Sequence, residues 1–454
     1  MDIKSTLEAL LGQLAGFLWG LPLVILLVGG GLFFLFYSRL IPYRHLPESL
    51  RLLTRPPDKD EPGQLSHFQA LCTALSGTLG MGNVSGVALA IAMGGPGAIF
   101  WMWVSALLGI ATKFYTCTLA VMYKGKDSEG EWQGGPMYVI REGLGRRWLP
   151  LAYFFALAGM FGTLPIFQIN QLVQVLRDTI AIPSGITSVD SHFTFDLVVG
   201  CVLAVIVLIV GLGKLPRLGR IARIIVPSMV AGYVLLTGFV LLSHASQVPA
   251  ALALIVTDAF TGNAVAGGVV GTVIITGIRR AAFSNEAGIG TEAMAHGAAQ
   301  TKEPVREGLV AMLGPIVDTL IVCTCTALVI LISGVWESGE ANGATLTATA
   351  FGELFPMGGS VILALLVSAL GLSTVFTFWY YGSKCLGFLI GAQYQHHYIW
   401  FYIVLVVVGA VASMQIVVNL IDSMYALMAI PTMTATLLLA PKVNKAAKSY
   451  FNKA

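Results

Sequence analysis

The sequence predicts an all-α polytopic membrane protein, and three observations lead to this fold class. Hydrophobic residues make up 56% of the 454-residue chain and charged residues only 11%, whereas soluble domains carry about 25% charged residues. Apolar windows of about 20 residues recur along the chain, as membrane-crossing helices require. Basic residues gather between alternate windows. A soluble domain is therefore excluded, the lipid bilayer is the expected surrounding, and no nucleic-acid partner is expected.

The apolar windows predict eleven transmembrane helices. The first window, residues 13–38, has no signal-peptide cleavage site and should remain as an anchor. A linker rich in Pro and Arg follows, up to residue 64. Ten further windows lie near residues 67–92, 98–123, 149–175, 196–212, 222–243, 260–283, 308–333, 359–388, 398–413 and 416–440.

The distribution of basic residues predicts the orientation in the membrane. If the N-terminus is outside, 24 of the 26 Lys and Arg residues fall on the inner side, among them Arg279 and Arg280, and only Lys4 and Arg177 fall outside. This asymmetry follows the positive-inside rule. We expect a multi-pass protein of the plasma membrane with its N-terminus outside and its C-terminus in the cytoplasm.

Ten helices remain after the opening helix, and they divide into two sets of five. The predicted divisions are an N-terminal helix and cytoplasmic linker (1–64), two repeats (65–243 and 244–441) and a cytoplasmic tail (442–454). Glycines interrupt the first helix of each set, at 77–86 and at 267–277. Because five is odd, the second set must run inverted, and such repeats place a binding site near the midplane. The alternative is that these glycines form small-residue packing faces.

The first interruption offers groups for a zwitterionic solute such as an amino acid. The backbone amides of Met81 and Gly82, at the start of a half-helix, would meet a carboxylate. Thr78 can add a hydroxyl, and Asn83 can either brace the loop or touch the ligand. Acceptors for an ammonium group are expected at the second interruption, namely at Gly271, Thr272, Thr276 and Gly277.

A third helix presents an aromatic ring beside side-chain amides. Phe167, Asn170, Gln171 and Gln174 share one helical face by their spacing. This face is a candidate wall of the solute site. The alternative is a hydrogen-bonded seam between helices.

A further helix carries adjacent hydroxyls, Ser373 and Thr374, one turn after the Leu370 carbonyl. The carbonyls of Ser76 and Leu79 could complete an oxygen cage for sodium, a hard cation that oxygen ligands suit. The alternative is that both hydroxyls bond to their own helix.

Three acids, Glu286, Asp318 and Asp422, are predicted at membrane depth, where they could relay protons. Asp318 has the alternative of an ion pair with Lys113 or Arg280. The polar, glycine-rich run 282–292 is expected to line or gate the inner pathway.

Three motifs resemble the alanine/glycine:cation symporter family, the sodium–alanine symporters. They are the run Gly94–Gly109, the Gly-Thr-x-Gly-x-Gly-Asn stretch at 77–83 and the Ser-Asn-Glu-Ala-Gly-x-Gly stretch at 284–290. The resemblance implies a LeuT-type fold with discontinuous first and sixth core helices and uptake of alanine or glycine with sodium. It also implies that Ser76, Leu79, Leu370, Ser373 and Thr374 hold sodium, and that Thr78, Met81 and Gly82 hold the substrate carboxylate.

The predicted function is therefore sodium-coupled symport of small neutral amino acids by alternating access, with no organic cofactor. A proton-coupled permease is the nearest alternative, followed by a channel or sensor. An enzyme is disfavoured, because the histidines lie near segment ends and the acids form no catalytic motif. The six cysteines show no metal spacing and are expected to be buried thiols.

Overall fold

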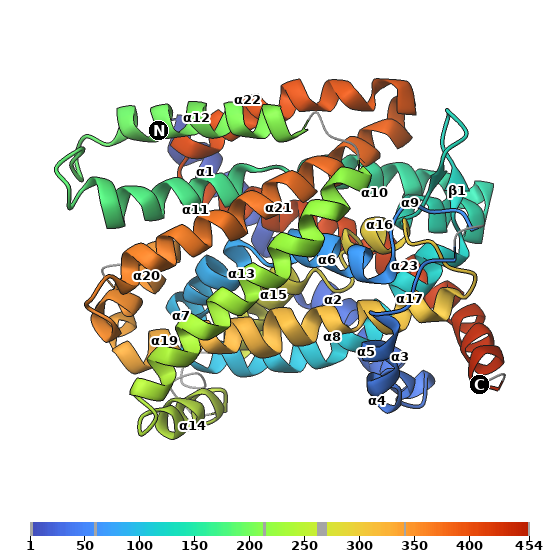
Figure 1. Ribbon diagram of the computed structural model, residues 1–454, viewed down its shortest axis with the longest axis horizontal. Coiled ribbons are helices and arrows are strands. Elements are labelled where there is room, and N and C mark those ends of the chain that lie inside the picture. The colour runs from blue at the N-terminus through green and yellow to red at the C-terminus, as the bar shows by residue number, and fades with distance from the viewer. Residues whose placement is uncertain (1–2, 59–60, 212–214, 261–269, 340–341, 453–454) are drawn as a thin grey trace.

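The computed structural model describes residues 3–58, 61–211, 215–260, 270–339 and 342–452, and it is almost entirely helical (Figure 1). Its first half contains α1 (Ile3–Leu18), α2 (Leu21–Val24), α3 (Gly30–Tyr37), α4 (Ile41–Arg44), α5 (Leu46–Leu52), α6 (His67–Thr78), α7 (Val87–Gly94), α8 (Gly97–Met122), α9 (Pro136–Tyr138), α10 (Leu149–Gly162), α11 (Ile166–Leu176) and α12 (Phe193–Gly211).

The second half contains α13 (Leu215–Ser243), α14 (Val248–Asp258), α15 (Val270–Asn285), α16 (Glu292–His296), α17 (Pro304–Ala311), α18 (Leu313–Pro315), α19 (Thr324–Ser333), α20 (Gly343–Leu354), α21 (Gly359–Ile390), α22 (Tyr398–Val411) and α23 (Met414–Phe451). π-Helical turns occupy Ile25–Gly29, Gly82–Gly86, Val139–Leu144, Arg177–Ala181 and Ile316–Cys323, and 3-10 turns occupy Arg146–Trp148, Val335–Glu337 and Ala392–His397. Two short antiparallel strands, β1 (Gly125–Lys126) and β2 (Trp132–Gln133), form a hairpin.

Eight helices among the described residues are long and apolar enough to cross a membrane, and two bent pairs raise this number to ten. One bent pair comprises α1 and the segment 21–37, and the other comprises α6 and the segment 82–94. The predicted segment 260–283 begins among residues outside the described ranges, and its described part is α15. Eleven crossings thus remain a prediction, whereas a polytopic helical fold is confirmed.

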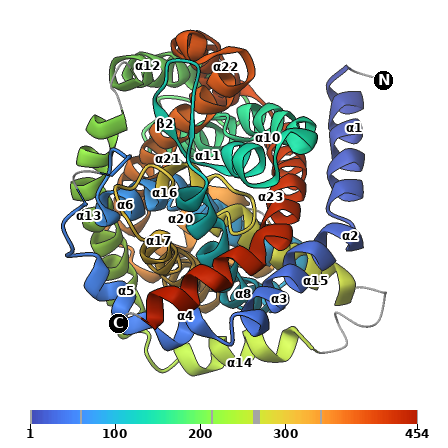
Figure 2. The same cartoon turned by 90° about the vertical axis from the view of Figure 1, so that its right-hand side faces the viewer.

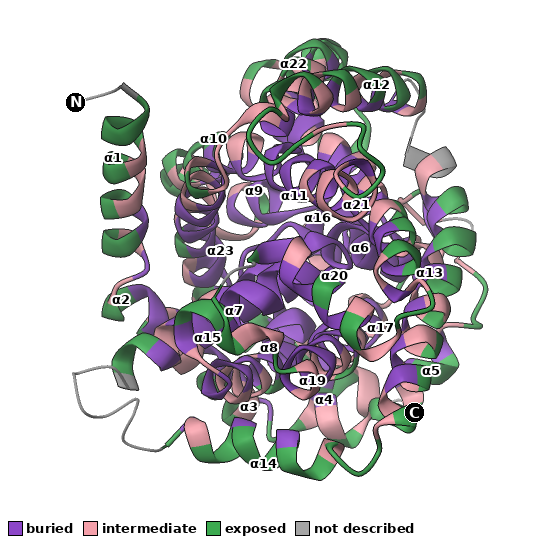
Figure 3. Ribbon diagram, turned by 90° about the vertical axis from the view of Figure 1, so that its left-hand side faces the viewer, coloured by how far each residue is buried: buried purple, intermediate pink, exposed green. Residues whose placement is uncertain are grey.

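The buried residues concentrate in the middle of the bundle, around α6, α7, α8 and α16 (Figure 3). Helices α1, α12, α14 and α22 lie at the periphery and expose many apolar side chains, as helices that face lipid do. The inner helix α8 is buried over 83% of its most apolar stretch, whereas α12 is buried over 22%. Polar groups on α6, α8 and α16 are therefore shielded by an outer layer of helices.

The connecting segments gather at two opposite ends of the bundle. The hairpin, α16, α17 and the C-terminus lie toward the right of Figure 1, and α14, α20 and the loop between α11 and α12 lie toward its left. Viewed from the right-hand end, α17 lies near α5 and the C-terminal part of α23 (Figure 2). We call this right-hand side the linker end, because the residues that precede α6 lie there.

Two basic residues that were counted as inner charges do not lie in a connecting segment. Arg279 and Arg280 lie within α15 and pair with Asp422 of α23. Burying a guanidinium requires such a partner, because an unpaired charge away from water is costly. They are therefore helix residues and not loop residues, and their position on the inner side stays a prediction.

Candidate functional site

The first break begins where α6 ends. Ser66 starts this helix with a capping box, in which its hydroxyl accepts from the Gln69 amide and the Gln69 side chain accepts from the Ser66 amide. Leu79 then leaves the helical region with φ −77° and ψ 87°. The chain re-enters a helix at Gly82, and the two halves meet at a bend of 54°. The backbone between them is free to bond to other helices.

Five oxygens from α6 and α21 meet beside this break. The Ser373 hydroxyl lies 2.8 Å from the Leu370 carbonyl and 3.4 Å from the Ser76 carbonyl. The Thr374 hydroxyl lies 3.2 Å from the Leu370 carbonyl and 3.4 Å from the Leu79 carbonyl. All five residues are at most 8% exposed. The structure thus brings together every residue predicted to hold sodium.

The spacing of these oxygens suits a small hard cation. Oxygens about 2.4 Å from a central ion, at right angles to one another, lie about 3.4 Å apart, which matches the two distances between α6 and α21. The hydroxyls also bond within their own helix, as the alternative interpretation expected. An apolar cavity of about 320 Å³ borders the cluster at Ser76 and Ser373.

The amide of Met81 has a partner that the sequence analysis did not include. It donates to the side-chain oxygen of Gln168 on α11 at 2.9 Å. Gln168 is buried and lies one position from the predicted face of Phe167 and Asn170. The Thr78 hydroxyl has only a long contact of 3.5 Å, to the Leu75 carbonyl of its own helix.

Asn83 braces the break. Its side-chain oxygen accepts from the Gly80 amide at 3.0 Å, and its nitrogen donates to the Asp318 carboxylate at 2.6 Å and to the Ser284 hydroxyl at 3.1 Å. Ser284 and Thr319 donate to the same carboxylate at 2.8 and 2.6 Å. The hydrogen-bond partners of Asp318 are therefore neutral groups, and its suggested ion pair with Arg280 was wrong.

Aromatic rings close one side of the break. The Phe167 ring packs edge-on against Phe283 with centroids 4.7 Å apart, and Phe283 lies 5.5 Å from the Tyr425 ring. A Cβ atom on Gly82 would lie 3.2 Å from the Ser284 backbone. The absence of a side chain at residue 82 therefore lets α15 approach the break closely.

Asn170 and Gln171 lie further along the same helix and serve a different purpose. The Asn170 amide nitrogen donates to the carbonyls of Gly409 and Ala412, and the Gln171 oxygen accepts from the Ala344 amide. These bonds hold the ends of α22 and α20. The two residues therefore form the hydrogen-bonded seam that was the alternative to a substrate wall.

The part of the second predicted break that lies within the described residues is helical. Val270–Asn285 is one continuous helix, so the residues predicted as unwound acceptors, Gly271, Thr272, Thr276 and Gly277, lie on α15; Gly267 and Gly268 lie outside the described residues. A Cβ on Gly277 would lie 2.5 Å from the Ala98 carbonyl, and one on Gly94 would contact Thr276. The glycine at 277 is thus a close-packing position, because it lets α15 contact α8.

The helix is instead interrupted after Asn285, within the run expected to line or gate the inner pathway. Glu286, Gly288 and Gly290 adopt positive φ of 58°, 83° and 101°. The Asn285 side chain accepts from the Ala287 amide, and Thr291 and Tyr425 donate to the Glu286 carboxylate. The interruption therefore relies on left-handed backbone geometry held by polar contacts within the run and to α23.

The model of the sodium:alanine symporter family matches residues 4–454. The chain belongs to this family. It is 38% identical over 455 residues to the sodium/alanine symporter of Methanococcus maripaludis, covering 99% of this chain and 98% of that protein. It is 33% identical to an amino-acid carrier protein of Bacillus subtilis over 99% and 93% of the two chains.

The fold is similar to that of a solved amino-acid complex. The structure of MhsT in complex with L-phenylalanine aligns with a TM-score of 0.61 and 13% identity, covering 83% of this chain and 89% of that chain. Membership of the family and this LeuT-type fold identify the protein as a secondary transporter of the membrane.

Proposed function

We propose that this member of the family is a sodium-coupled symporter of small neutral amino acids that works by alternating access. The observation that carries the proposal is the convergence of five oxygens from α6 and α21 beside the first break. Sodium would bind among the carbonyls of Ser76, Leu79 and Leu370 and the hydroxyls of Ser373 and Thr374. Because these groups belong to two helices, the ion would favour conformations in which the helices are close.

The amino acid would bind on the other side of the break. A substrate carboxylate can replace the Gln168 oxygen as acceptor for the Met81 amide, next to Gly82 and the Thr78 hydroxyl. Because one short stretch of backbone serves both ligands, each would order the break for the other, which is positive coupling.

Close packing at the break favours substrates with small side chains. Phe167 and Phe283 pack directly over the break, and Gly82 contacts the backbone of α15. Asn83 is proposed to position the loop, through Gly80 and Asp318, rather than to bind the solute. Asn170, Gln171 and the four positions on α15 are no longer proposed as substrate contacts.

Counterflow of labelled alanine in proteoliposomes, with and without sodium, tests the proposal directly. We expect exchange that saturates and requires sodium. Sodium-independent exchange would overturn the coupling, and flux without counterflow would indicate a channel. A panel of L-alanine, D-alanine, glycine and leucine would then measure the size limit.

Proton coupling is the second candidate, and the buried Asp318 carboxylate, one side chain from the break, favours it. Uptake of alanine driven by a pH gradient in sodium-free buffer would support this alternative.

The two five-helix repeats, 65–243 and 244–441, and a cytoplasmic linker end remain part of the proposal. A C-terminal reporter found on the extracytoplasmic side would overturn the orientation.

A further inference from the structure

A basic pocket lies near the linker end, between the segment after α3 and the end of α23. Figure 2 shows the C-terminal part of α23 passing α3 and α4. Arg39 and Arg44 line the pocket from the first segment, and Lys445 and Lys448 line it from α23. Its cavity of about 650 Å³ has the size of a site for a small organic ligand.

The pocket lies where both helices change from apolar to basic sequence. Helix α3 consists only of glycine, leucine and aromatic residues, and Arg39 follows it two residues later. In α23 residues 437–440 are apolar, and Lys442, Lys445 and Lys448 follow. Apolar stretches lie in the hydrocarbon of a bilayer, and basic side chains beyond their ends meet the lipid headgroups. The pocket is therefore expected at the depth of the headgroups.

The positive charges of the pocket are unpaired within the part of the chain that the structure describes. Arg39, Arg44, Lys445 and Lys448 are exposed and form no ion pair there. No acidic side chain among the described residues lines the pocket. The pocket therefore attracts an anion from outside the protein.

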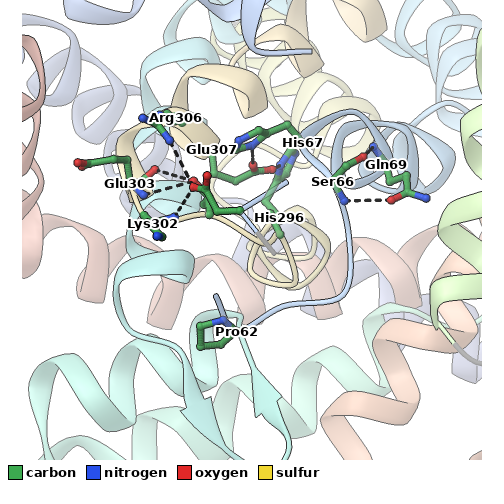
Figure 4. A network of polar contacts seen from close by, with 12 residues as sticks. Pro62, Ser66, His67, Gln69, His296, Lys302, Glu303, Arg306 and Glu307 are labelled. Atoms are coloured by element: carbon green, nitrogen blue, oxygen red, sulfur yellow. Dashed lines mark hydrogen bonds and ion pairs between the residues drawn. The ribbon is translucent and has the colours of Figure 1, made fainter. Parts of the chain in front are cut away.

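Neighbouring basic residues differ, because the protein itself supplies their partners. His45, at the edge of the same pocket, contacts Glu48 at 3.3 Å. Arg306 pairs with Asp58 at 3.4 Å, within the network of polar contacts in Figure 4. The unpaired charges thus gather around the cavity and are not a general property of this end.

The corner between α3 and α4 has an unusual backbone. Arg39 and Leu40 adopt positive φ of 55° and 63°, a conformation that side chains disfavour. Asn444 of α23 holds this corner, because its side-chain nitrogen donates to the Tyr37 carbonyl at 2.9 Å. The positive-inside rule explains basic residues on one side of a membrane, but it does not require a braced junction of two distant segments around one cavity.

We propose that this pocket binds the headgroup of an anionic phospholipid. The planar guanidinium groups of Arg39 and Arg44 present paired donors to phosphate oxygens, and the two lysines add point charges. Phe36 also lines the pocket and is 69% exposed, so its ring is available to an acyl chain, which a free phosphate lacks. The bound lipid would tie the corner after α3 to the end of α23.

Isothermal titration calorimetry on the delipidated protein in an uncharged detergent tests the proposal. Dihexanoyl phosphatidylglycerol is the anionic probe, and dihexanoyl phosphatidylcholine is the zwitterionic one. Glycerol 3-phosphate supplies the phosphate without acyl chains. We expect phosphatidylglycerol to bind at one saturable site, and each of the other two probes to bind at least about tenfold more weakly.

Variants from both segments locate the site. Lys445→Gln combined with Lys448→Gln should weaken the binding of phosphatidylglycerol about 25-fold, at about fivefold for each basic side chain removed. Arg44→Gln should weaken it about fivefold from the other segment. The matched control is Arg220→Gln combined with Arg223→Gln on α13, which removes two exposed charges that do not line the pocket. It should keep the parental affinity.

Equal affinity for the two lipids, or parental affinity in the lysine variant or in Arg44→Gln, would overturn the proposal. Glycerol 3-phosphate that binds as tightly as phosphatidylglycerol would assign the pocket to a soluble phosphate compound and would overturn the lipid assignment. If a variant does not fold, the comparison of the three probes on the parent protein still decides. Sodium-independent alanine exchange would defeat the proposed function while leaving these affinities unchanged.

Discussion

The two helix breaks free their backbone in different ways. At the first break the chain unwinds without a positive φ, and the bonds that the Ser76 and Leu79 carbonyls accept from Ser373 and Thr374 of α21 are long, at 3.4 Å. At the second break Glu286, Gly288 and Gly290 are left-handed, and Tyr425 and Thr432 of α23 donate to the Glu286 carboxylate and the Ile289 carbonyl at 3.1 and 2.9 Å. Long, weak bonds to these carbonyls are exchanged for an ion at low cost, whereas shorter bonds to a neighbouring helix hold a fixed shape. The first break is thus suited to binding and the second to structure.

The largest effect that would test this difference is expected from Gly80→Ala. A Cβ at this position would lie 2.3 Å from the Thr374 hydroxyl and 3.0 Å from the Gln168 side-chain oxygen, so one methyl group disturbs both proposed ligand sites. Overpacking of about 3 kcal/mol corresponds to a loss of about 100-fold in alanine counterflow.

Gly86→Ala provides the matched control for Gly80→Ala. It lies in the same broken helix, but the nearest atom to its added Cβ is 3.9 Å away, an ordinary contact. It should keep parental counterflow. Wild-type activity of Gly80→Ala would show that the first break adapts freely and does not form a fixed site.

The second break is tested by Gly290→Ala. Its φ of 101° disfavours a side chain, and the added Cβ would lie 2.6 Å from both Pro136 and Thr432. Strain and clash should together lower the unfolding free energy by about 3 kcal/mol, measured as a lower melting temperature. Gly271→Ala, at a predicted break position that is helical and has nothing within 4 Å, should be neutral or stabilising by up to about 1 kcal/mol. If Gly271→Ala lowered the melting temperature and Gly290→Ala did not, the break would instead lie at 271–277.

A smaller effect is expected from Thr374→Ala, which removes one of five oxygens without adding bulk. Losing about 1.4 kcal/mol of ion binding should raise the sodium concentration for half-maximal counterflow about tenfold. Thr349→Ala is the control, because this hydroxyl bonds only the Thr345 carbonyl of its own helix and is exposed. An unchanged sodium dependence in Thr374→Ala would remove this residue from the site.

Sequence reasoning found the first break because glycines and polar groups coincide there in an otherwise apolar helix. It also paired Ser373 and Thr374 with the correct carbonyls, since adjacent hydroxyls at membrane depth need acceptors. It expected unwinding at Gly271, Thr272, Thr276 and Gly277, which are helical, because glycine density looks similar whether the glycines unwind a helix or let it pack closely. The interruption within the described residues begins at Glu286, inside the glycine-rich run 282–292, where Glu286 itself is a residue type that gives no signal for a positive φ.

The amide-rich face of α11 shows a related limit. Helical periodicity correctly places Phe167, Asn170 and Gln171 on one face, but it does not say which neighbour each residue meets. Phe167 contacts Phe283 beside the break, whereas Asn170 and Gln171 reach α22 and α20. Gln168, which accepts from the Met81 amide, lies just outside the face. Helical periodicity in a sequence gives the face on which a residue lies. The packing of the folded protein decides which neighbour that residue contacts.

An effect of pH is expected from Lys124, which ties the segment before the first broken helix, at Pro62, to the segment after the second, at Ala299. Burial lowers the pKa of Lys124 from 10.5 to about 8 in the folded protein. Between these two values the unfolded chain holds more protons than the folded one, so the contribution of Lys124 to the unfolding free energy rises with pH. At pH 7 both states are protonated and the burial penalty is complete.

Lys124→Met removes this titration together with both hydrogen bonds, and the loss of the bonds is the same at every pH. The melting temperature of the parent protein, relative to that of Lys124→Met, should therefore be higher at pH 9.5 than at pH 7. Other titrating groups are common to both proteins and cancel in the difference. A difference that stays constant between the two pH values would mean that Lys124 keeps its ordinary proton affinity, and hence that the linker end is open to water around this ammonium group.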